Sequence, residues 1–405
     1  MNRDIALARR VLQQAQADVI TAGQKPNPQF SWTTQNINPN RGVNSGPLRG
    51  KTVDSIFRVD QLIERGEKAE LRVATAQQLE TAAVEDVSDI VRTQLLTLRG
   101  AYFDLLAAQE KFANATDAAF LYGKTIEAAN LRRRAGDLAG ADVARIQVDA
   151  LRAQNDARAA EADLVRSRIS LAFLIGADAE AARIRIKSTW PALDAAQVLQ
   201  AQAADMVSRR PDVRAAQARV TASDKARELA QSLRKRDVAV GLQYEHWPNQ
   251  ADFNNQGTGN SFGVAVSVPL FLRHNHEGEI ARAQADWYAA RDFLEKIRAQ
   301  ALVEVSKARG DLESARDRLV RFETELLPQA EKSAAAAEFA FRNGAIGVMD
   351  LLDARRTLKI ILIDASTARA DHAKARAAWQ SNTEIASIPY EGRRVPDYQT
   401  KDVKP

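Results

Sequence analysis

Phe341-Arg-Asn-Gly344-Ala-Ile346-Gly-Val-Met-Asp350-Leu-Leu-Asp353-Ala-Arg355 decides the fold, because one long Ala-rich helical pattern runs into it and another runs out of it. Gly344 is expected at the C′ position, where a helix ends with a positive φ. Asp350 and Asp353 then lie three residues apart at the start of the next helix, so both carboxylates share one helix face. The stretch therefore predicts two helices joined by a turn, with acidic residues at the start of the second helix.

The same turn occurs earlier as Ala135-Gly136-Asp-Leu-Ala-Gly-Ala-Asp142-Val-Ala-Arg145. One offset relates Gly136 to Gly344, Asp142 to Asp350, and Asp4 to Asp212. A single offset that spans half a chain indicates an internal repeat. We therefore divide the chain into a first repeat, a linker, a second repeat and a C-terminal tail: 1–176, 177–208, 209–384 and 385–405.

The composition is typical of long helices and excludes several classes of protein. The 405 residues carry a formal net charge of +5, and basic and acidic side chains are mixed along the helical stretches. Mixed charge is typical of a solvated helix surface, so we expect no nucleic-acid partner. The chain contains no cysteine, which excludes disulfides and cysteine-based metal sites.

No stretch near the start of the chain reads as a targeting or membrane-spanning segment. No apolar run is long enough for a transmembrane helix. Met1-Asn-Arg-Asp4 opens directly onto an amphipathic helix, so no signal peptide is recognisable. An exported protein would therefore have lost its targeting segment from this sequence.

Each half is predicted to contain one very long helix and two shorter ones. Residues 64–134 contain no proline, and a helix of roughly 70 residues would be about 100 Å long, which indicates a coiled coil or rod. The second long helix is expected over 277–342, with a kink at Pro328. The shorter helices are expected over 4–22, 140–175, 211–234 and 347–383.

Each half also contains two stretches in which apolar residues alternate with small or polar ones. Strands near ten residues long with one apolar face match tilted membrane-spanning strands. Four strands cannot close a barrel, and open edges are not tolerated in lipid, so three chains would supply about twelve strands to a shared barrel. The expected lipid-facing residues are Phe30, Trp32, Phe57, Val240, Leu242, Tyr244, Phe262, Val264 and Val266.

The predicted fold is thus mostly α with membrane β: a homotrimeric β-barrel with four strands per chain, continued by a long α-helical barrel. Trp32 and Tyr244 would lie in the aromatic girdle at the membrane interface. A soluble coiled-coil scaffold is the alternative. It explains the helices but not two hairpins with apolar faces at equivalent repeat positions.

A sequence with these features resembles the TolC family of outer membrane efflux proteins. Pro-Asp-Val at 211–213, Val-Pro-Leu-Phe at 268–271 and the 341–355 stretch carry the resemblance. It implies a trimeric tunnel across the outer membrane and periplasm of a Gram-negative bacterium, which docks with a periplasmic membrane-fusion adaptor and an inner-membrane pump of the RND type. The stretches 60–68 and 271–280 resemble the heavy-metal (CzcC-type) branch.

The resemblance also implies roles for the two turns. Asp350 and Asp353, with Asp142 from the first repeat, would line the periplasmic aperture as acidic rings. The turn tips, Gly136, Gly344, Arg134 and Asn343, would face the adaptor. The family gate uses a tyrosine and an arginine where this chain has Phe341 and Ile346, so the contacts that close this tip must differ.

The expected function is a passive duct, energised by the pump, that exports divalent heavy-metal cations. A multidrug or organic-compound duct and a type I secretion duct for proteins are the alternatives. No catalytic set or phosphate loop is evident, so neither an enzyme nor a cofactor is expected. His274 and His276, with Glu277, are weak candidates for a metal site, because polar residues are common where a strand joins a helix.

Overall fold

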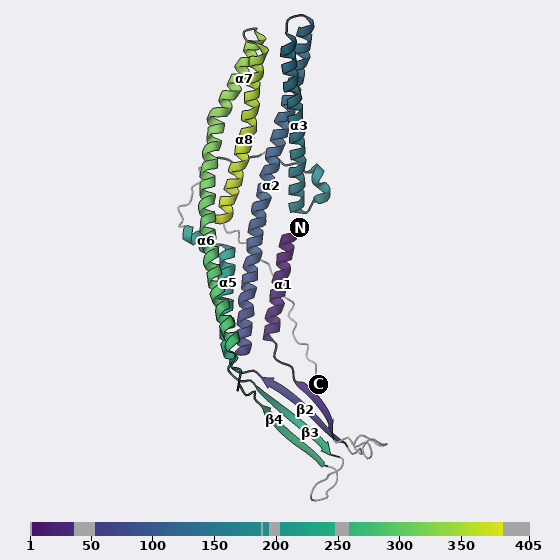
Figure 1. Cartoon of the computed structure of the whole chain (residues 1–405), viewed down its shortest axis with the longest axis vertical. Helices are drawn as coiled ribbons and strands as arrows, with labels where there is room; N and C mark the ends of the chain where they lie inside the picture. The colour runs from purple at the N-terminus through teal and green to yellow at the C-terminus, as the bar shows by residue number, and fades with distance from the viewer. Residues whose placement is uncertain (1, 36–52, 188, 194–202, 248–258, 384–405) are drawn as a thin grey trace, which may run out of the picture. The chain divides into compact units, whose positions relative to one another are not determined.

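A computed structural model describes residues 2–35, 53–187, 189–193, 203–247 and 259–383. The expected tail at 385–405 and most of the polar loops after the first and third strands lie outside these residues. The elements follow one another as α1 (Arg3–Gly23), β1 (Gln29–Gln35), β2 (Asp54–Ile63), α2 (Lys68–Arg134), α3 (Gly140–Ile175), a 3₁₀ helix (Asp178–Arg183), α4 (Ala203–Arg209), α5 (Pro211–Ser232), β3 (Val238–Trp247), β4 (Gly259–Ser267), α6 (Glu277–Arg321), a π turn (Phe322–Leu326), α7 (Leu327–Arg342) and α8 (Val348–Thr383) (Figure 1).

The four strands form one antiparallel sheet in the order β1-β2-β3-β4. The two hairpins predicted from alternation are therefore joined through β2 and β3, which belong to different halves of the chain. Within the described residues, β1 and β4 each pair along one edge only. The predicted combination of long helices with a small four-stranded sheet is confirmed.

Helix boundaries follow local chemistry closely. α3 spans Gly140–Ile175, as predicted, and Gly176 ends it with a φ of 70° in the left-handed region. α2 begins at Lys68, later than expected, because Gly66 and Glu67 both have positive φ and hold the chain out of the helix. Left-handed residues of this kind stop helix propagation, so they fix where the strand ends and the rod begins.

The second long helix is interrupted just ahead of Pro328. The π turn Phe322–Leu326 separates α6 from α7, and Pro328 lies in the first turn of α7. Proline lacks an N–H and its ring crowds the carbonyl four residues earlier. A π turn widens the helix at that point and accommodates the missing hydrogen bond. The regular helix is therefore interrupted by a π turn just ahead of Pro328, and the kink at Pro328 stays a prediction.

The chain divides into two compact units, each drawn from both halves of the sequence. The helical unit contains 1–9, 85–213 and 297–405, so it holds α3, α4, α7, α8 and most of α2 and α6. The sheet unit contains 10–84 and 214–296, so it holds the four strands, most of α1 and α5, and the remaining parts of α2 and α6. The division between the two units falls inside both long helices, at residues 84–85 of α2 and 296–297 of α6.

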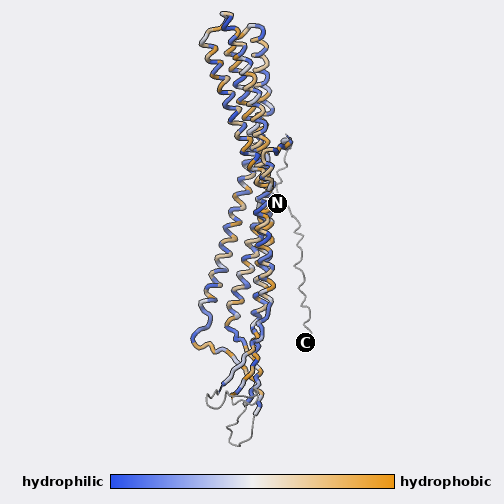
Figure 2. Tube along the Cα trace, turned by 90° about the vertical axis from the view of Figure 1, so that its right-hand side faces the viewer, coloured by the Kyte–Doolittle hydropathy of each residue, from blue (hydrophilic) through white to orange (hydrophobic). Residues whose placement is uncertain are grey.

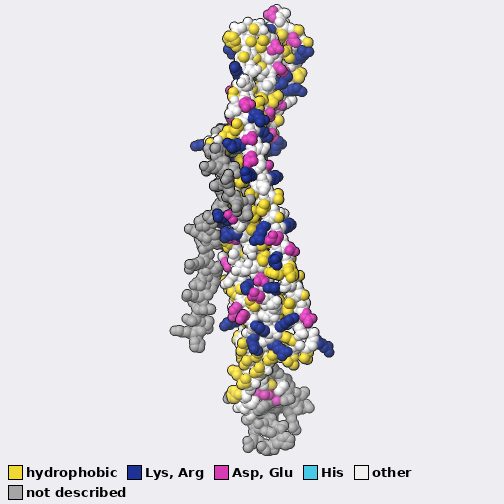
Figure 3. Space-filling view, turned by 90° about the vertical axis from the view of Figure 1, so that its left-hand side faces the viewer, with side chains coloured by type: hydrophobic (Ala, Val, Ile, Leu, Met, Phe, Trp, Pro, Cys, Tyr) yellow, Lys and Arg dark blue, Asp and Glu magenta, His cyan; other side chains and the backbone are white. Residues whose placement is uncertain are grey.

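The helices carry mixed surfaces. Hydrophilic and hydrophobic residues alternate along every helical tube in Figure 2. Figure 3 shows Lys, Arg, Asp and Glu interspersed over the helices, with hydrophobic side chains gathered near the strands. No helix among the described residues combines the length and the apolar character needed to cross a membrane.

Candidate functional site

The two predicted helix-reversing turns have the same backbone design. Gly136 has a φ of +86° and Gly344 a φ of +73°. In each turn the N–H of the glycine and the N–H of the next residue donate to carbonyls of the last helical turn, over 2.8–3.1 Å. This is the Schellman arrangement, which satisfies carbonyls that a helix end would otherwise leave unpaired. The positive φ predicted at Gly344 is confirmed.

The flanking residues predicted to face an adaptor are on the surface. Arg134 and Asn343 are both exposed, as are the two glycines. The side-chain amide of Asn343 donates to the Phe339 carbonyl over 2.8 Å, so it caps its own helix. Open space surrounds the α-carbons of Gly136 and Gly344. The turns therefore present small, accessible surfaces.

The three candidate aperture acids each have a local contact. Asp350 accepts a hydrogen bond from the Gly347 N–H over 3.2 Å, which is the carboxylate half of a capping box at the start of α8. Asp142 occupies the equivalent place in α3 and lies 3.9 Å from Arg145. The side chain of Asp353 is 77% exposed and pairs with Arg356 over 3.1 Å. These contacts fix the helix starts and leave the carboxylates at the surface.

Next to the turns, α2 and α7 are joined by contacts that involve Phe341. The Arg132 guanidinium lies 5.5 Å from the centre of the Phe341 ring, within cation–π range. One turn away, Glu338 pairs with Arg342 over 2.7 Å and with Arg355 of α8 over 3.5 Å. The hydrogen bond from Arg342, and then the charge of Arg355, lower the pKa of Glu338. A cleft of about 380 Å³ lies among these side chains.

Beneath the turns an apolar cluster fixes the helices. Leu352 is fully buried and packs with Tyr122, Ile146 and small residues of α2 and α3. Leu351 is 3% exposed. Both leucines, which lie between the two aspartates in sequence, are therefore packing residues. Because α8 is anchored in this way, the positions of Asp350 and Asp353 are set by the helix core.

In the sheet unit, the nine predicted lipid-facing residues lie on one face of the sheet. Trp32 pairs with Phe57, Phe57 with Tyr244, and Tyr244 with Phe262, so four aromatic rings cross the sheet in a row. Neighbouring ring centroids lie 5.3–6.2 Å apart. The next rows contain aliphatic pairs, and Phe262 is 86% exposed and Val264 73% exposed. Large apolar side chains thus form a continuous surface across four strands.

The opposite face of the sheet is polar, as the alternation predicts, but no role was predicted for the ion pair that lies on it. Arg58 pairs with Asp60 over 2.7 Å across the neighbouring Gly241. A β-carbon at Gly241 would lie only 2.3 Å from the Asp60 carboxylate, so a side chain there would displace the ion pair. Gln243 and Glu245 continue the polar face along β3. The signal was present in the spacing of Arg58 and Asp60, which puts both on one face.

The turn from β2 into α2 is held by charged groups. Lys68 is buried and donates to Asp237 over 2.8 Å and to the Lys235 carbonyl over 2.7 Å. Arg72 forms a bidentate pair with Glu64, at 2.5 and 2.9 Å, and this hydrogen bonding lowers the pKa of Glu64. The residues that carry the resemblance at 60–68 therefore build the strand-to-helix join.

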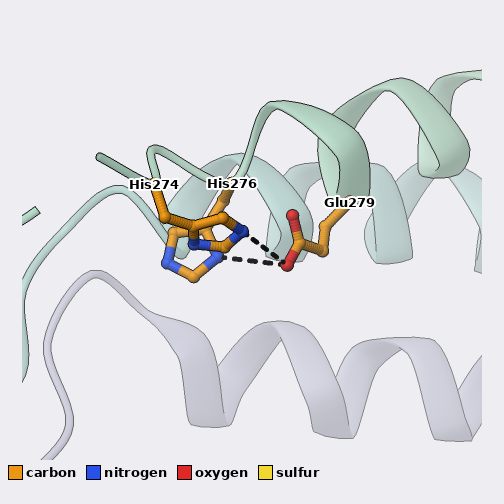
Figure 4. A group of neighbouring side chains, drawn as sticks. All are labelled: His274, His276 and Glu279. Carbon is orange, nitrogen blue, oxygen red and sulfur yellow. Dashed lines mark ion pairs between the residues drawn. The ribbon is translucent and has the colours of Figure 1, made fainter.

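The corresponding turn from β4 into α6 brings together the two candidate histidines. His274 and His276 approach Glu279 in the first turn of α6, as Figure 4 shows. The acid is Glu279, three residues after His276, and not Glu277 as expected. The helix begins at Glu277, and an i,i+3 spacing returns the side chain of Glu279 to the face of its first residues.

Comparisons with known proteins agree with this geometry. The family model described as outer membrane efflux protein matches residues 197–384. The cobalt-zinc-cadmium resistance protein CzcC of Cupriavidus metallidurans is 25% identical over 362 residues, which cover 88% of this chain and 81% of that protein.

Solved structures share the fold at low sequence identity. A membrane protein from Pseudomonas aeruginosa superposes with a TM-score of 0.78 at 16% identity, covering 94% of this chain and 90% of that one. The outer membrane protein VceC from Vibrio cholerae gives 0.75 at 18%, covering 95% and 93%. CusC, described in terms of transmembrane channel formation, gives 0.72 at 15%, covering 94% and 89%.

Proposed function

Because the chain belongs to the outer membrane efflux protein family, we propose that it is the outer membrane channel of a tripartite efflux system for divalent heavy-metal cations. Members of this family are passive channel components and not enzymes. Their place is the outer membrane of Gram-negative bacteria, from which they span the periplasm. The cargo and the specific partners are the parts of the proposal that go beyond family membership.

The observation that carries the channel function is the apolar face of the sheet. A row of aromatic rings and two aliphatic rows are exposed on it, while the other face holds the Arg58–Asp60 pair. Apolar side chains outward and polar side chains inward is the pattern of a barrel wall in lipid. The one-sided pairing of β1 and β4 supports closure by further copies of the chain, since open strand edges are not stable in lipid.

Channels of this family are trimers that work with adaptors and inner-membrane pumps. Three copies would bring about twelve strands to a common barrel. We place the strands in the outer membrane and the turns at Gly136 and Gly344 at the end of the channel that faces the adaptor. Asp350, Asp353 and Asp142 then line the aperture. In this arrangement residues 1–176 and 209–384 are structural repeats, joined by the equatorial linker 177–208.

The metal cargo rests on the relative in Cupriavidus metallidurans, which is named for resistance to cobalt, zinc and cadmium. Its similarity covers most of both chains, and so reaches the strands, the long helices and the turns. The pump would be of the RND type, with a membrane-fusion adaptor between pump and channel.

Deletion of the gene in its native host tests the cargo. We expect growth to fail at lower concentrations of zinc, cobalt or cadmium salts, and a plasmid copy to restore tolerance. Unchanged metal tolerance with new sensitivity to organic compounds would replace the metal cargo by a multidrug one. Loss of an extracellular protein would favour type I secretion instead.

The channel itself is tested separately. The purified protein should run as a heat-modifiable trimer from the outer membrane fraction and conduct ions in planar bilayers. A monomer recovered from another fraction would contradict the channel whatever the strain tolerates.

A further inference from the structure

We propose that His274, His276 and Glu279 form a binding site for a divalent transition-metal cation of the zinc class, at the turn from β4 into α6. The site belongs to the chain itself and does not depend on what the channel carries. Two histidines come from the turn and the glutamate from the helix, so a bound ion would cross-link the two.

The distances favour shared coordination over hydrogen bonding. His274 Nε2 lies 3.4 Å and His276 Nδ1 3.6 Å from the same oxygen of Glu279. Both separations exceed the roughly 2.7–3.2 Å of N–H···O hydrogen bonds. Ligand atoms about 2.0–2.1 Å from a tetrahedral metal lie about 3.3 Å from one another. The three ligand atoms, all within 4.8 Å of each other, therefore have nearly the spacing that a metal requires.

His276 carries a further indication. Its Nδ1 is inaccessible to solvent and has no hydrogen-bond partner within the described residues. A buried polar atom without a partner is costly, and a metal ligand bond would remove that cost.

The equivalent turn of the first half shows that the backbone does not require histidine. Glu67 directly precedes α2 with a φ of 60°, and His276 directly precedes α6 with a φ of 58°. Each carbonyl accepts the first hydrogen bond of its helix, at 2.9 and 3.1 Å. In that first turn, Arg65 occupies the place of His274, and arginine offers no lone pair to a metal. The backbone conformation of the turn therefore does not require the two histidines.

The surroundings allow an ion to enter. The side chain of His274 is 66% exposed and that of Glu279 47%, whereas His276 is 21% exposed and packs edge-on against Phe271. Both rings and the Glu279 carboxylate point toward one another in Figure 4. Two imidazoles and one carboxylate suit zinc, cobalt, nickel or copper, while magnesium and calcium prefer oxygen alone. Water would complete the coordination.

The test is a Co²⁺ titration of the purified, detergent-solubilised protein made without a histidine tag. We expect one Co²⁺ per chain with the visible absorption of a tetrahedral complex, displaced by Zn²⁺ but not by Mg²⁺. Glu279→Gln and His274→Ala/His276→Ala should each weaken binding by about tenfold or more. Glu277→Gln, on the same helix turn, and Glu70→Gln, at the equivalent place in α2, are matched controls and should bind as the wild type does.

Either of two results would overturn the site: a wild-type protein that takes up no Co²⁺, or binding that survives loss of both histidines. Equal weakening by Glu277→Gln would also do so, because the effect would then be general electrostatics. Circular dichroism and the heat-modifiable trimer band establish that each variant is folded. Glu279→Gln preserves the shape of the side chain, so it separates coordination from packing.

Discussion

Gly344 ends α7 with a φ of +73°, in open space where an added methyl group would touch nothing. Gly344→Ala should therefore destabilise the protein only through its backbone, by about 1–2 kcal/mol, the penalty of a left-handed residue with a β-carbon. Gly310→Ala is the control. Gly310 lies inside α6, also in open space, where alanine is worth about 1 kcal/mol more than glycine.

Thermal unfolding in detergent, followed by circular dichroism, measures both variants. The midpoint should fall for Gly344→Ala and rise for Gly310→Ala. If both substitutions shift the midpoint in the same direction, the left-handed backbone is not what constrains Gly344.

At the scale of elements, the ends of α2 and α7 are joined by Arg132 stacked on Phe341. Cation–π contacts at exposed sites contribute about 0.5–1 kcal/mol, so loss of this contact would loosen the ends of α2 and α7 at the aperture that we propose. Arg132→Gln and Phe341→Ala should therefore raise single-channel conductance in planar bilayers. Phe341→Tyr should retain the closed conductance, because tyrosine keeps the ring.

Arg133→Gln provides the control for charge, since Arg133 is exposed in the same helix turn. A rise in conductance as large for Arg133→Gln as for Arg132→Gln would mean that lost positive charge, and not the stacked contact, opens the channel.

The elements themselves were largely predictable from sequence, because their signals are local. Alternation identified the strands and their apolar face, and glycine with the surrounding apolar period set the ends of α3. The contact of Arg132 with Phe341 was not predictable, since these residues are far apart in the chain and meet only when α2 and α7 pack. The partner of the histidines was predicted wrongly as Glu277, because the choice depended on where α6 begins.

At the scale of the whole molecule, a single chain does not complete a barrel. Among the described residues, β1 and β4 each have one unpaired edge, and the apolar face of the sheet is exposed. The internal repeat that we propose would explain how one chain supplies so much of the wall. Equivalent turns with glycines at positive φ end both long helices, at Gly136 and Gly344. A trimer of such chains would bring six turns of similar chemistry to the proposed aperture, so any charge on a turn would be multiplied around it.

That multiplication leads to the prediction for the aspartates. Asp350 and Asp353, repeated in three chains, would make the aperture selective for cations, since clustered carboxylates raise the local cation concentration. Asp350→Asn with Asp353→Asn should therefore raise anion permeability, measured as a shift of reversal potential across a salt gradient. Arg356 pairs with both Asp353 and Asp149, so Arg356→Gln should shift the potential in the opposite direction. Asp311→Asn is the control, because it removes a negative charge from an exposed position of α6. Unchanged selectivity in the double variant would exclude the acidic rings.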